Sequence, residues 1–314
     1  MLGKKIATRE AYGDALVELG KENPNVVVLD ADLSASTRTS KFAAQFPERF
    51  FQMGIAEQDM MGTAAGLAAA GKIPFASTFA MFATGRAYDQ VRNSIGYPGL
   101  NVKIGATHAG VTVGEDGATH QALEDIALMR AIPGMTVIVP ADYVEAVQAV
   151  KAAAAHVGPV YLRFTRGGVP VVFGDDYQFQ LGKAALLRDG GDATIIACGV
   201  MVGAALEAAE ALAGEGLSIR VLNMGTIKPL DGEAVIKAAR ETGAVVTAEE
   251  HSIIGGLGSA VAEVLGENCP VPMKRVGVPD VFGQSGGAGE LLEHYGLTAA
   301  NVAQRVREVV GRKA

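Results

Sequence analysis

The sequence has no tryptophan and is poor in cysteine. Cys198 and Cys269 are the only two cysteines among its 314 residues. Two cysteines cannot form the disulfide framework that holds small secreted domains together, so we expect free thiols and a reducing compartment. The N-terminus, Met-Leu-Gly-Lys-Lys-Ile-Ala-Thr, has no apolar segment of the kind found in secretory signals. Together these absences predict a cytoplasmic location.

An excess of basic residues is also missing. The chain has 27 Lys and Arg residues against 34 Asp and Glu residues, for a net charge of −7, whereas nucleic-acid-binding proteins carry a basic surface. Its longest stretch without charge, residues 193–206, is shorter than the about 20 apolar residues of a membrane-spanning helix. We therefore expect neither a nucleic acid nor a membrane as partner.

The residues that are present are typical of a compact α/β protein. Hydrophobic residues make up 49% of the chain and charged residues only 19%, which excludes a disordered chain. Strand and helix patterns alternate, which predicts parallel sheets flanked by helices. The predicted strands are 26–29, 50–53, 101–105, 135–139, 160–164, 193–197, 218–222 and 244–248, and the predicted helices include 57–70, 123–130, 201–213, 231–242 and 298–310.

The pattern divides into two consecutive domains. Residues 167–182 lose their periodicity and contain Gly, Pro and adjacent Asp residues, as expected of a connection. We place a first domain at 1–170, a linker at 171–186 and a second domain at 187–314, each domain an α/β unit with a mostly parallel sheet and flanking helices. Ligands of such sheets bind at the carboxyl ends of the strands.

Glu57 follows a predicted strand and begins a helix rich in Ala and Gly. A glutamate in the first turn stabilises a helix through its dipole, which is one explanation for this residue. The alternative is chemical, because a carboxyl group in apolar surroundings retains a proton more readily and can share it with a ring nitrogen. In the same helix, Gly62 and Gly66 leave a flat face that suits either internal packing or a subunit contact.

Phe79 and Phe82 form an aromatic pair in a chain with 11 Phe and 7 Tyr residues. Pairs with this spacing commonly lie in a hydrophobic core. They can also offer a face on which a flat heterocycle stacks.

A third group of polar residues lies in residues 107–121, where Thr107-His108 precedes Gly114-Glu115-Asp116-Gly117-Ala118-Thr119-His120-Gln121. His and Asp can ligate zinc or iron, but their spacing here matches no compact metal motif. Recognition of hydroxyl groups, with Asp116 as acceptor and His120 as donor, fits a polyol substrate better.

The second domain contains three further features. Gly255-Gly256-Leu257-Gly258 precedes a predicted helix without completing a dinucleotide fingerprint, and indicates a tight turn. His251 is expected near a subunit interface. Residues 283–289, rich in Gly, are expected to form a flexible loop to which we assign no function.

Several of these stretches, in this order along the chain, resemble the pyrimidine-binding domain of the transketolase family: Gly54-Ile55-Ala56-Glu57, Ser77-Thr78-Phe79 with Phe82, Thr107-His108, residues 114–121 and Pro140-Ala141-Asp142. Lys228-Pro229-Leu230-Asp231 and Thr247-Ala248-Glu249-Glu250-His251 resemble the family's C-terminal domain. The resemblance covers almost the whole chain. It implies a thiamine-diphosphate-binding fold followed by a transketolase C-terminal domain, and transfer of a two-carbon ketol unit between a ketose phosphate and an aldose phosphate.

The resemblance also implies roles for individual residues. Glu57 would hydrogen-bond the pyrimidine ring nitrogen of thiamine diphosphate and promote its imino tautomer, and with His120 it is an expected catalytic residue. The other expected cofactor-binding residues are Phe82, Phe79, Asp32 and Ile55. The expected residues for the phosphorylated sugar are Arg9, Ser36, His108, Asp116, His120 and Arg166. Without the resemblance, Arg9 would be interpreted as a solvated residue of a first helical turn.

Two departures from the family pattern affect these expectations. Gly85 stands where many transketolases have a tyrosine, and the following Arg86-Ala87-Tyr88-Asp89-Gln90 is closer to deoxyxylulose phosphate synthases. The Gly-Asp-Gly with which the family's diphosphate-binding domain holds magnesium does not occur in the sequence. We therefore expect no metal site in this chain, a partner subunit that holds Mg²⁺ and the diphosphate, and an α₂β₂ heterotetramer in which this chain also self-associates.

Other functions remain open at this point. The β subunit of a 2-oxo acid dehydrogenase has the same domain order, but Arg9, Arg166 and residues 114–120 favour a phosphorylated sugar over a lipoyl domain. An activity like that of deoxyxylulose phosphate synthase is a further alternative. A non-catalytic thiamine-fold protein that acts as a binding or regulatory module is a third possibility, but Glu57, Phe82, Asp116 and His120 together argue against it.

Overall fold

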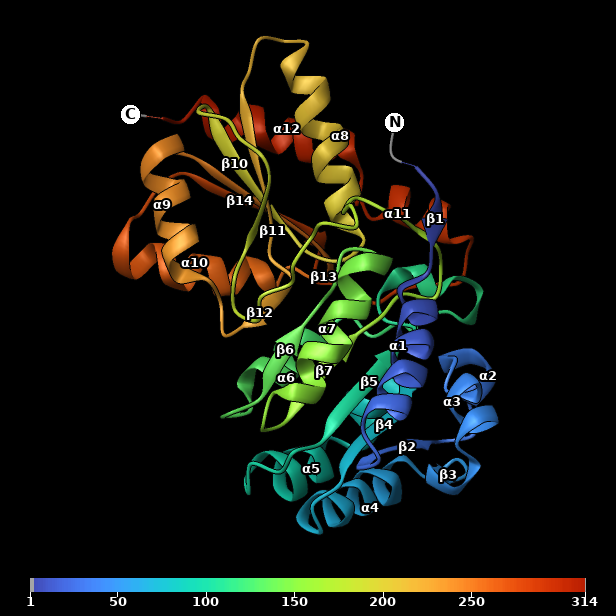
Figure 1. Cartoon of the computed structure of the whole chain (residues 1–314). Helices are drawn as coiled ribbons and strands as arrows, with labels where there is room; N and C mark the ends of the chain where they lie inside the picture. The colour runs from blue at the N-terminus through green and yellow to red at the C-terminus, as the bar shows by residue number, and fades with distance from the viewer. Residues whose placement is uncertain (1–2, 314) are drawn as a thin grey trace.

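The structure of the chain is a computed structural model that describes residues 3–313. These residues form a seven-stranded sheet, a five-stranded sheet and a two-stranded ribbon. Figure 1 shows the two larger sheets as separate layers, each flanked by helices. The predicted fold class, an α/β protein of two units with mostly parallel sheets, is confirmed.

The seven-stranded sheet has the strand order β12-β6-β7-β5-β4-β2-β3. Six of its strands are parallel and come from the first half of the chain: β2 (Val26–Asp30), β3 (Phe50–Gln52), β4 (Ile73–Phe79), β5 (Lys103–Thr107), β6 (Thr136–Ile138) and β7 (Val160–Arg163). Helices cover both faces: α1 (Thr8–Glu22) packs beside α7 (Tyr143–Ala155) on one face, and α4 (Glu57–Ala69) and α6 (Asp125–Ala131) lie on the other (Figure 1). Val28 and Leu29 therefore point into different cores although they are neighbours, which explains the continuous apolar run of β2.

The five-stranded sheet has the order β14-β13-β10-β11-β9. Its parallel strands are β10 (Ala193–Ala197), β11 (Ile219–Asn223), β13 (Val245–Ser252) and β14 (Met273–Val278), and the antiparallel strand β9 (Ala185–Arg188) lies at one edge. The helices of this half are α8 (Met201–Ala213), α9 (Gly232–Thr242), α10 (Leu257–Asn268), α11 (Ala288–His294) and α12 (Ala299–Val310). Short helices elsewhere are α2 (Ser34–Thr37), α3 (Ser40–Gln45) and α5 (Tyr88–Gln90).

One strand crosses between the halves. The strand β12 (Thr226–Lys228) follows β11 in sequence but pairs antiparallel with β6 in the first sheet. Sequence periodicity did not indicate it, because three residues are too few to show a period and its partner lies outside its own half. The domain boundaries at 170 and 186 stay a prediction. The strand β8 (Val169–Pro170) pairs with β1 (Lys5–Ile6). Between β8 and β9 the chain forms no helix or strand.

The glycine-rich segments differ in their structural roles. The Cβ positions of Gly62 and Gly66 on α4 have no atom within 4 Å, so this face of the helix is uncovered rather than packed internally. The 283–289 segment is a loop as far as Gly287, and α11 begins at Ala288. Its flexibility stays a prediction. The turn expected at 255–258 lies at 253–255, and α10 already begins at Leu257. The N-terminus of this helix donates the backbone N–H groups of Leu257 and Gly258 to the Glu249 carboxylate.

Residues 3–313 contain neither a helix that could span a membrane nor a cluster of side chains that could hold a metal ion. No helix there has both the length and the apolar character needed to cross a membrane. In the same range no three His, Cys, Asp or Glu side chains lie together in a way that could hold a metal ion.

Candidate active site

The predicted site residues gather at the carboxyl edge of the seven-stranded sheet. Phe79 ends β4, His108 follows β5, and Arg166 follows β7 by three residues. Because β2, β4, β5 and β7 are parallel neighbours, the residues that follow them meet at one edge although they lie far apart in sequence.

A hollow of about 510 Å³ opens at this edge, and we call it the anion pocket. Its lining brings together five of the six residues expected around the sugar phosphate, with Phe79 and with Ala35 and Arg38 from α2 and its C-terminal end. The sixth, His120, is not part of the lining. The lining residues are Arg9, Ala35, Ser36, Arg38, Phe79, His108, Asp116 and Arg166.

Arg9 lies in the first turn of α1, but it is not the solvated residue that its sequence context alone suggested. Its guanidinium donates from Nη1 to the Ser36 carbonyl at 2.9 Å and to His108 Nε2 at 3.2 Å. Its Nε is buried and has no hydrogen-bond partner, which is a donor that a bound anion would satisfy. Burial and the nearby charge of Arg38 lower the pKa of Arg9.

His108 is held as a neutral ring. Because an arginine can only donate, the Nε2 that faces Arg9 is an acceptor, and the hydrogen is on Nδ1, 2.8 Å from Thr107 Oγ1. Burial, reinforced by the charges of Arg9 and Arg166, lowers the pKa of His108 to about 3. The ring stacks on Phe79 with centroids 3.8 Å apart. His108 therefore orients Arg9 and adds no charge to the pocket.

Arg166 and Arg38 complete the cationic lining. Arg166 donates to the Val113 carbonyl and to Glu115 at 3.3 Å, and it lies 3.7 Å from Asp116. Arg38, which sequence reasoning missed, has a φ of +69° and donates its Nε to Glu10 at 2.6 Å. The signal that could have found it is its place two residues after Ser36, at the C-terminal end of α2. Three guanidinium groups around one hollow favour a dianion such as a phosphate ester.

The predicted aromatic pair and Glu57 form a second part of the site. Phe79 and Phe82 are stacked with centroids 5.8 Å apart and 16° between planes, and His120 meets Phe82 edge-on at 5.3 Å. Glu57 is 2% exposed at the N-terminus of α4. Since Phe79 lines the anion pocket and stacks on the Phe82 ring, the two parts of the site are continuous.

Arg86 occupies the space beside Glu57. Its Nη1 donates to both carboxylate oxygens of Glu57 at 3.0 Å, and its guanidinium carbon lies 4.4 Å from the centre of the Phe82 ring. A planar, nitrogen-bearing cation thus stacks on Phe82 and hydrogen-bonds Glu57 at once. Sequence reasoning noted Arg86 only as part of a family variation and gave it no role.

Two expected cofactor residues lie apart from these contacts. Asp32 is exposed with a φ of +64°, and its backbone N–H donates to Gln52 at 2.7 Å. Ile55 is 78% exposed in the turn before α4. Both assignments stay predictions.

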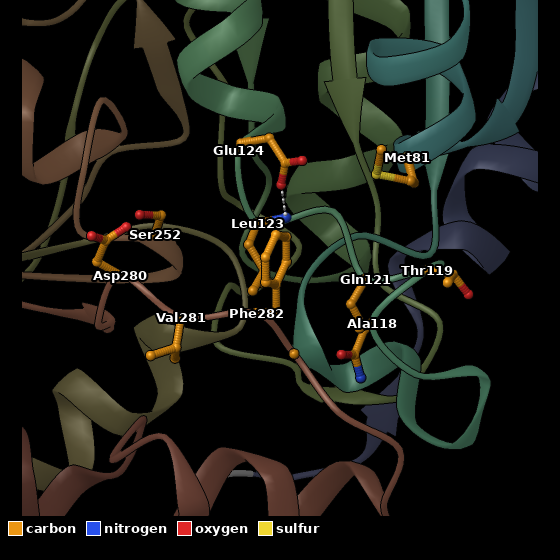
Figure 2. A pocket seen from close by; sticks show the side chains of 11 residues that line it. Met81, Ala118, Thr119, Gln121, Leu123, Glu124, Ser252, Asp280, Val281 and Phe282 are labelled. Atoms are coloured by element: carbon orange, nitrogen blue, oxygen red, sulfur yellow. Dashed lines mark hydrogen bonds between the residues drawn. The ribbon is translucent and has the colours of Figure 1, made fainter.

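A second hollow, of about 320 Å³, lies where the 118–124 segment faces the residues that follow β14. Figure 2 shows Met81, Thr119 and Gln121 on one side of it and Ser252 and Asp280 on the other, with Phe282 between them. Phe282 is 91% exposed. This hollow adjoins the loop that carries His120 but contains none of the predicted site residues.

Comparisons with known proteins show which family the chain resembles. The family model for the transketolase pyrimidine-binding domain matches residues 4–171, and that for the transketolase C-terminal domain matches residues 182–302. A 6-deoxy-6-sulfo-D-fructose transketolase subunit, SqwH, from a Clostridium species is 50% identical over 305 residues, which cover 97% of this chain and 95% of that protein. A subunit of an apulose-4-phosphate transketolase from Phocaeicola vulgatus is 42% identical over 311 residues, covering 99% of both chains.

A solved structure extends the agreement to the fold. It is described as a split gene transketolase, an inactive β4 tetramer, and it matches with a TM-score of 0.93 and 60% identity over 98% of this chain and 100% of that one. Both domains, their order and their coverage agree with the resemblance found in the sequence. The chain belongs to the transketolase family.

Proposed function

We propose that this chain is the C-terminal subunit of a split, thiamine-diphosphate-dependent transketolase, which transfers a two-carbon ketol unit from a ketose phosphate to an aldose phosphate. The observation that carries the proposal is the continuity of the arginine-lined anion pocket with the Glu57 and Phe82 site at one sheet edge. Relatives that are named as transketolase subunits match this chain over nearly their whole length, which gives the 2-oxo acid dehydrogenase alternative less support.

The residues at the second part of the site fit the pyrimidine of thiamine diphosphate. Arg86 already places a flat group with N–H donors on Phe82 and against both oxygens of Glu57, so the site accepts this shape and polarity. Glu57 would hold a ring nitrogen and share its proton, and Phe82 would stack on the ring. Bound there, the cofactor supplies the nucleophilic carbon that takes up the ketol unit.

The partner is a separate subunit with the diphosphate-binding domain. Names of relatives that include the word subunit support this proposal, as does the description of the split-gene structure as an inactive tetramer of β chains. We place Mg²⁺ and the diphosphate on the partner and expect an α₂β₂ assembly. The uncovered face of α4 at Gly62 and Gly66 is available for a subunit contact.

The substrates are phosphorylated sugars. Arg9, Arg38 and Arg166 would bind the phosphate, and His108 would keep Arg9 in place. Asp116 and His120 would contact sugar hydroxyls, since Asp116 lines the pocket and the His120 ring meets the Phe79 and Phe82 rings edge-on.

The experiment is reconstitution. This chain is purified alone and together with a companion chain that carries the diphosphate-binding domain, and ketol transfer is measured with thiamine diphosphate, Mg²⁺ and phosphorylated sugars. We expect activity only in the complex. Robust transfer by the isolated chain would refute the two-subunit assignment, and pyruvate-dependent reduction of a lipoyl domain without ketol transfer would refute the reaction.

A further inference from the structure

The loop formed by residues 110–122 carries two of the proposed substrate residues, Asp116 and His120. Its two ends meet: the backbone N–H of Gly110 donates to the Ala122 carbonyl at 3.0 Å, and Ala109 forms a β-bridge with Ala122. At its tip, Asp116 is exposed. The position of the tip therefore depends on what holds the two ends.

A carboxylate from the C-terminal domain lies at this closed end. Glu250, on β13, is 2% exposed, and its Oε1 accepts the backbone N–H of Thr112 at 2.6 Å. Gly110 has a φ of +79°, and a Cβ placed on it would lie 2.2 Å from the Glu250 carboxyl carbon. The loop backbone thus presses directly on the carboxylate, and only glycine fits at position 110.

Arg163 joins the same two elements from the other side. Its Nη2 donates to the Ala122 carbonyl at 3.3 Å and to the Glu250 carbonyl at 2.9 Å. Its Nε pairs with the buried Asp125 carboxylate at 2.7 Å. The backbone of β13 at Glu250 is therefore held against the end of the loop by a buried, charge-assisted contact.

A second part of the C-terminal domain supports the loop nearer its tip. Gln121 donates its Nε2 to the Gln284 carbonyl at 3.0 Å, and a Cβ on Gly117 would lie 2.6 Å from Ser285 Oγ. Figure 2 shows the segment with Val281 and Phe282 passing beside Gln121 and Ala118. The C-terminal domain thus contacts the loop at two separate places.

We propose that Glu250 is a positioning residue for ketol transfer, which acts through Thr112 to keep Asp116 and His120 at the sugar hydroxyls. The inference rests on the proposed function and extends it, because it gives the C-terminal domain a part in substrate binding. Glu250 touches neither Glu57 nor the aromatic pair, so its effect should fall on the sugar and not on the cofactor.

The test measures kinetics of the reconstituted complex with Glu250→Ala. We expect the KM for the sugar phosphates to rise by roughly 10–100-fold, since a displacement of about 1 Å in a positioning group can cost about 10²-fold, while the concentration of thiamine diphosphate for half activity stays unchanged. Glu250→Gln should restore the KM, because an amide oxygen still accepts the Thr112 N–H. If Glu250→Ala does not fold, Glu250→Asp is tested in its place. Its side chain is one methylene too short to reach Thr112, so the same rise in KM is expected.

The matched control is Glu249→Ala. Glu249 is the preceding residue of β13, is also buried, and also accepts backbone N–H groups, but those belong to α10 and not to the loop. The Glu249→Ala substitution should lower the Tm without changing the KM for the sugar phosphates. A wild-type KM in Glu250→Ala or Glu250→Asp would refute the inference, as would an equal change in the cofactor requirement. A wild-type complex without ketol transfer would instead refute the proposed function itself.

Discussion

Replacing Glu57 by Gln is the most direct perturbation of the candidate site. The Glu57 side chain is 1% exposed and accepts two hydrogen bonds from Arg86 at 3.0 Å. Glutamine has nearly the same volume and keeps one acceptor oxygen, but it cannot ionise or hold a proton in common with a ring nitrogen. The substitution therefore separates the chemistry of the carboxyl group from its packing.

The expected loss of stability is small. A hydrogen bond to a charged group contributes about 1.5–3 kcal/mol, but the Arg86 side chain is 49% exposed, so water replaces much of this interaction when the charge is removed. We expect a cost of about 1 kcal/mol, which changes the Tm by only a few degrees. The expected loss of turnover is much larger, on the order of 10²–10⁴-fold, which is what positioned proton transfer contributes.

The assay is ketol transfer by the complex of this chain with its companion, at saturating cofactor and sugars, with Tm measured on the same samples. Glu233→Gln is the matched control, because Glu233 is also a glutamate in the first turn of a helix, α9, but is exposed and lies in the C-terminal half, so it should leave turnover unchanged. Turnover of Glu57→Gln within threefold of the wild type, with an intact complex, would show that Glu57 does not act on the cofactor.

Three further predictions follow from the site and its surroundings. Arg9→Gln should raise the KM for phosphorylated sugars by about 10–100-fold, the equivalent of one charged hydrogen bond, with no change for an unphosphorylated analogue; equal changes for both would place the phosphate elsewhere. Arg86→Ala should lower the thiamine diphosphate concentration for half saturation by roughly tenfold, because one cation–π contact and one ion pair no longer compete with the cofactor; an equilibrium titration that gave an unchanged or higher value would contradict this. Burial raises the pKa of Glu250 to about 7, although the charge of Arg163 acts in the opposite direction. Between pH 4.5 and 7 the folded chain therefore holds a proton on Glu250 that the unfolded chain, with a pKa near 4.5, has released. The unfolding free energy should thus fall as the pH rises from about 4.5 to about 7, and Glu250→Gln should remove about 3 kcal/mol of that fall; urea unfolding at both ends of this range that showed equal changes in the two proteins would refute it.

Local sequence patterns predicted most strands of the first sheet, three of the five in the second, and helices in both halves. The strand at 26–29 and the helices at 57–70 and 201–213 were found because a buried strand and an amphipathic or Ala-rich helix leave a periodic signal over several residues. The strands β4, β12 and β14 and the helices α1 and α7 were not predicted; in β4, Pro74, Ser77 and Thr78 interrupt the apolar residues. β12 has three residues, and β14 is only partly buried, so neither carries a run of apolar side chains.

The candidate site divides in the same way. Glu57, Phe79 and Phe82 were found within short motifs, and Arg9 and Arg166 through a family resemblance that the parallel sheet then explains by bringing their elements to one edge. Arg38 and Arg86 were missed because their roles depend on contacts with Glu10 and Glu57, which no local pattern records.

The amino-acid sequence was sufficient to establish an α/β protein of two units, its family, and the motifs that carry the expected chemistry, because those properties depend on residue type and spacing along the chain. Tertiary structure alone decided that His108 is a neutral acceptor for Arg9, that Arg86 lies between Glu57 and Phe82, and that Glu250 supports a loop of the other domain. These are pairings between residues up to 138 positions apart. Their free energies depend on burial and on distances of about 3 Å, which only the folded chain defines.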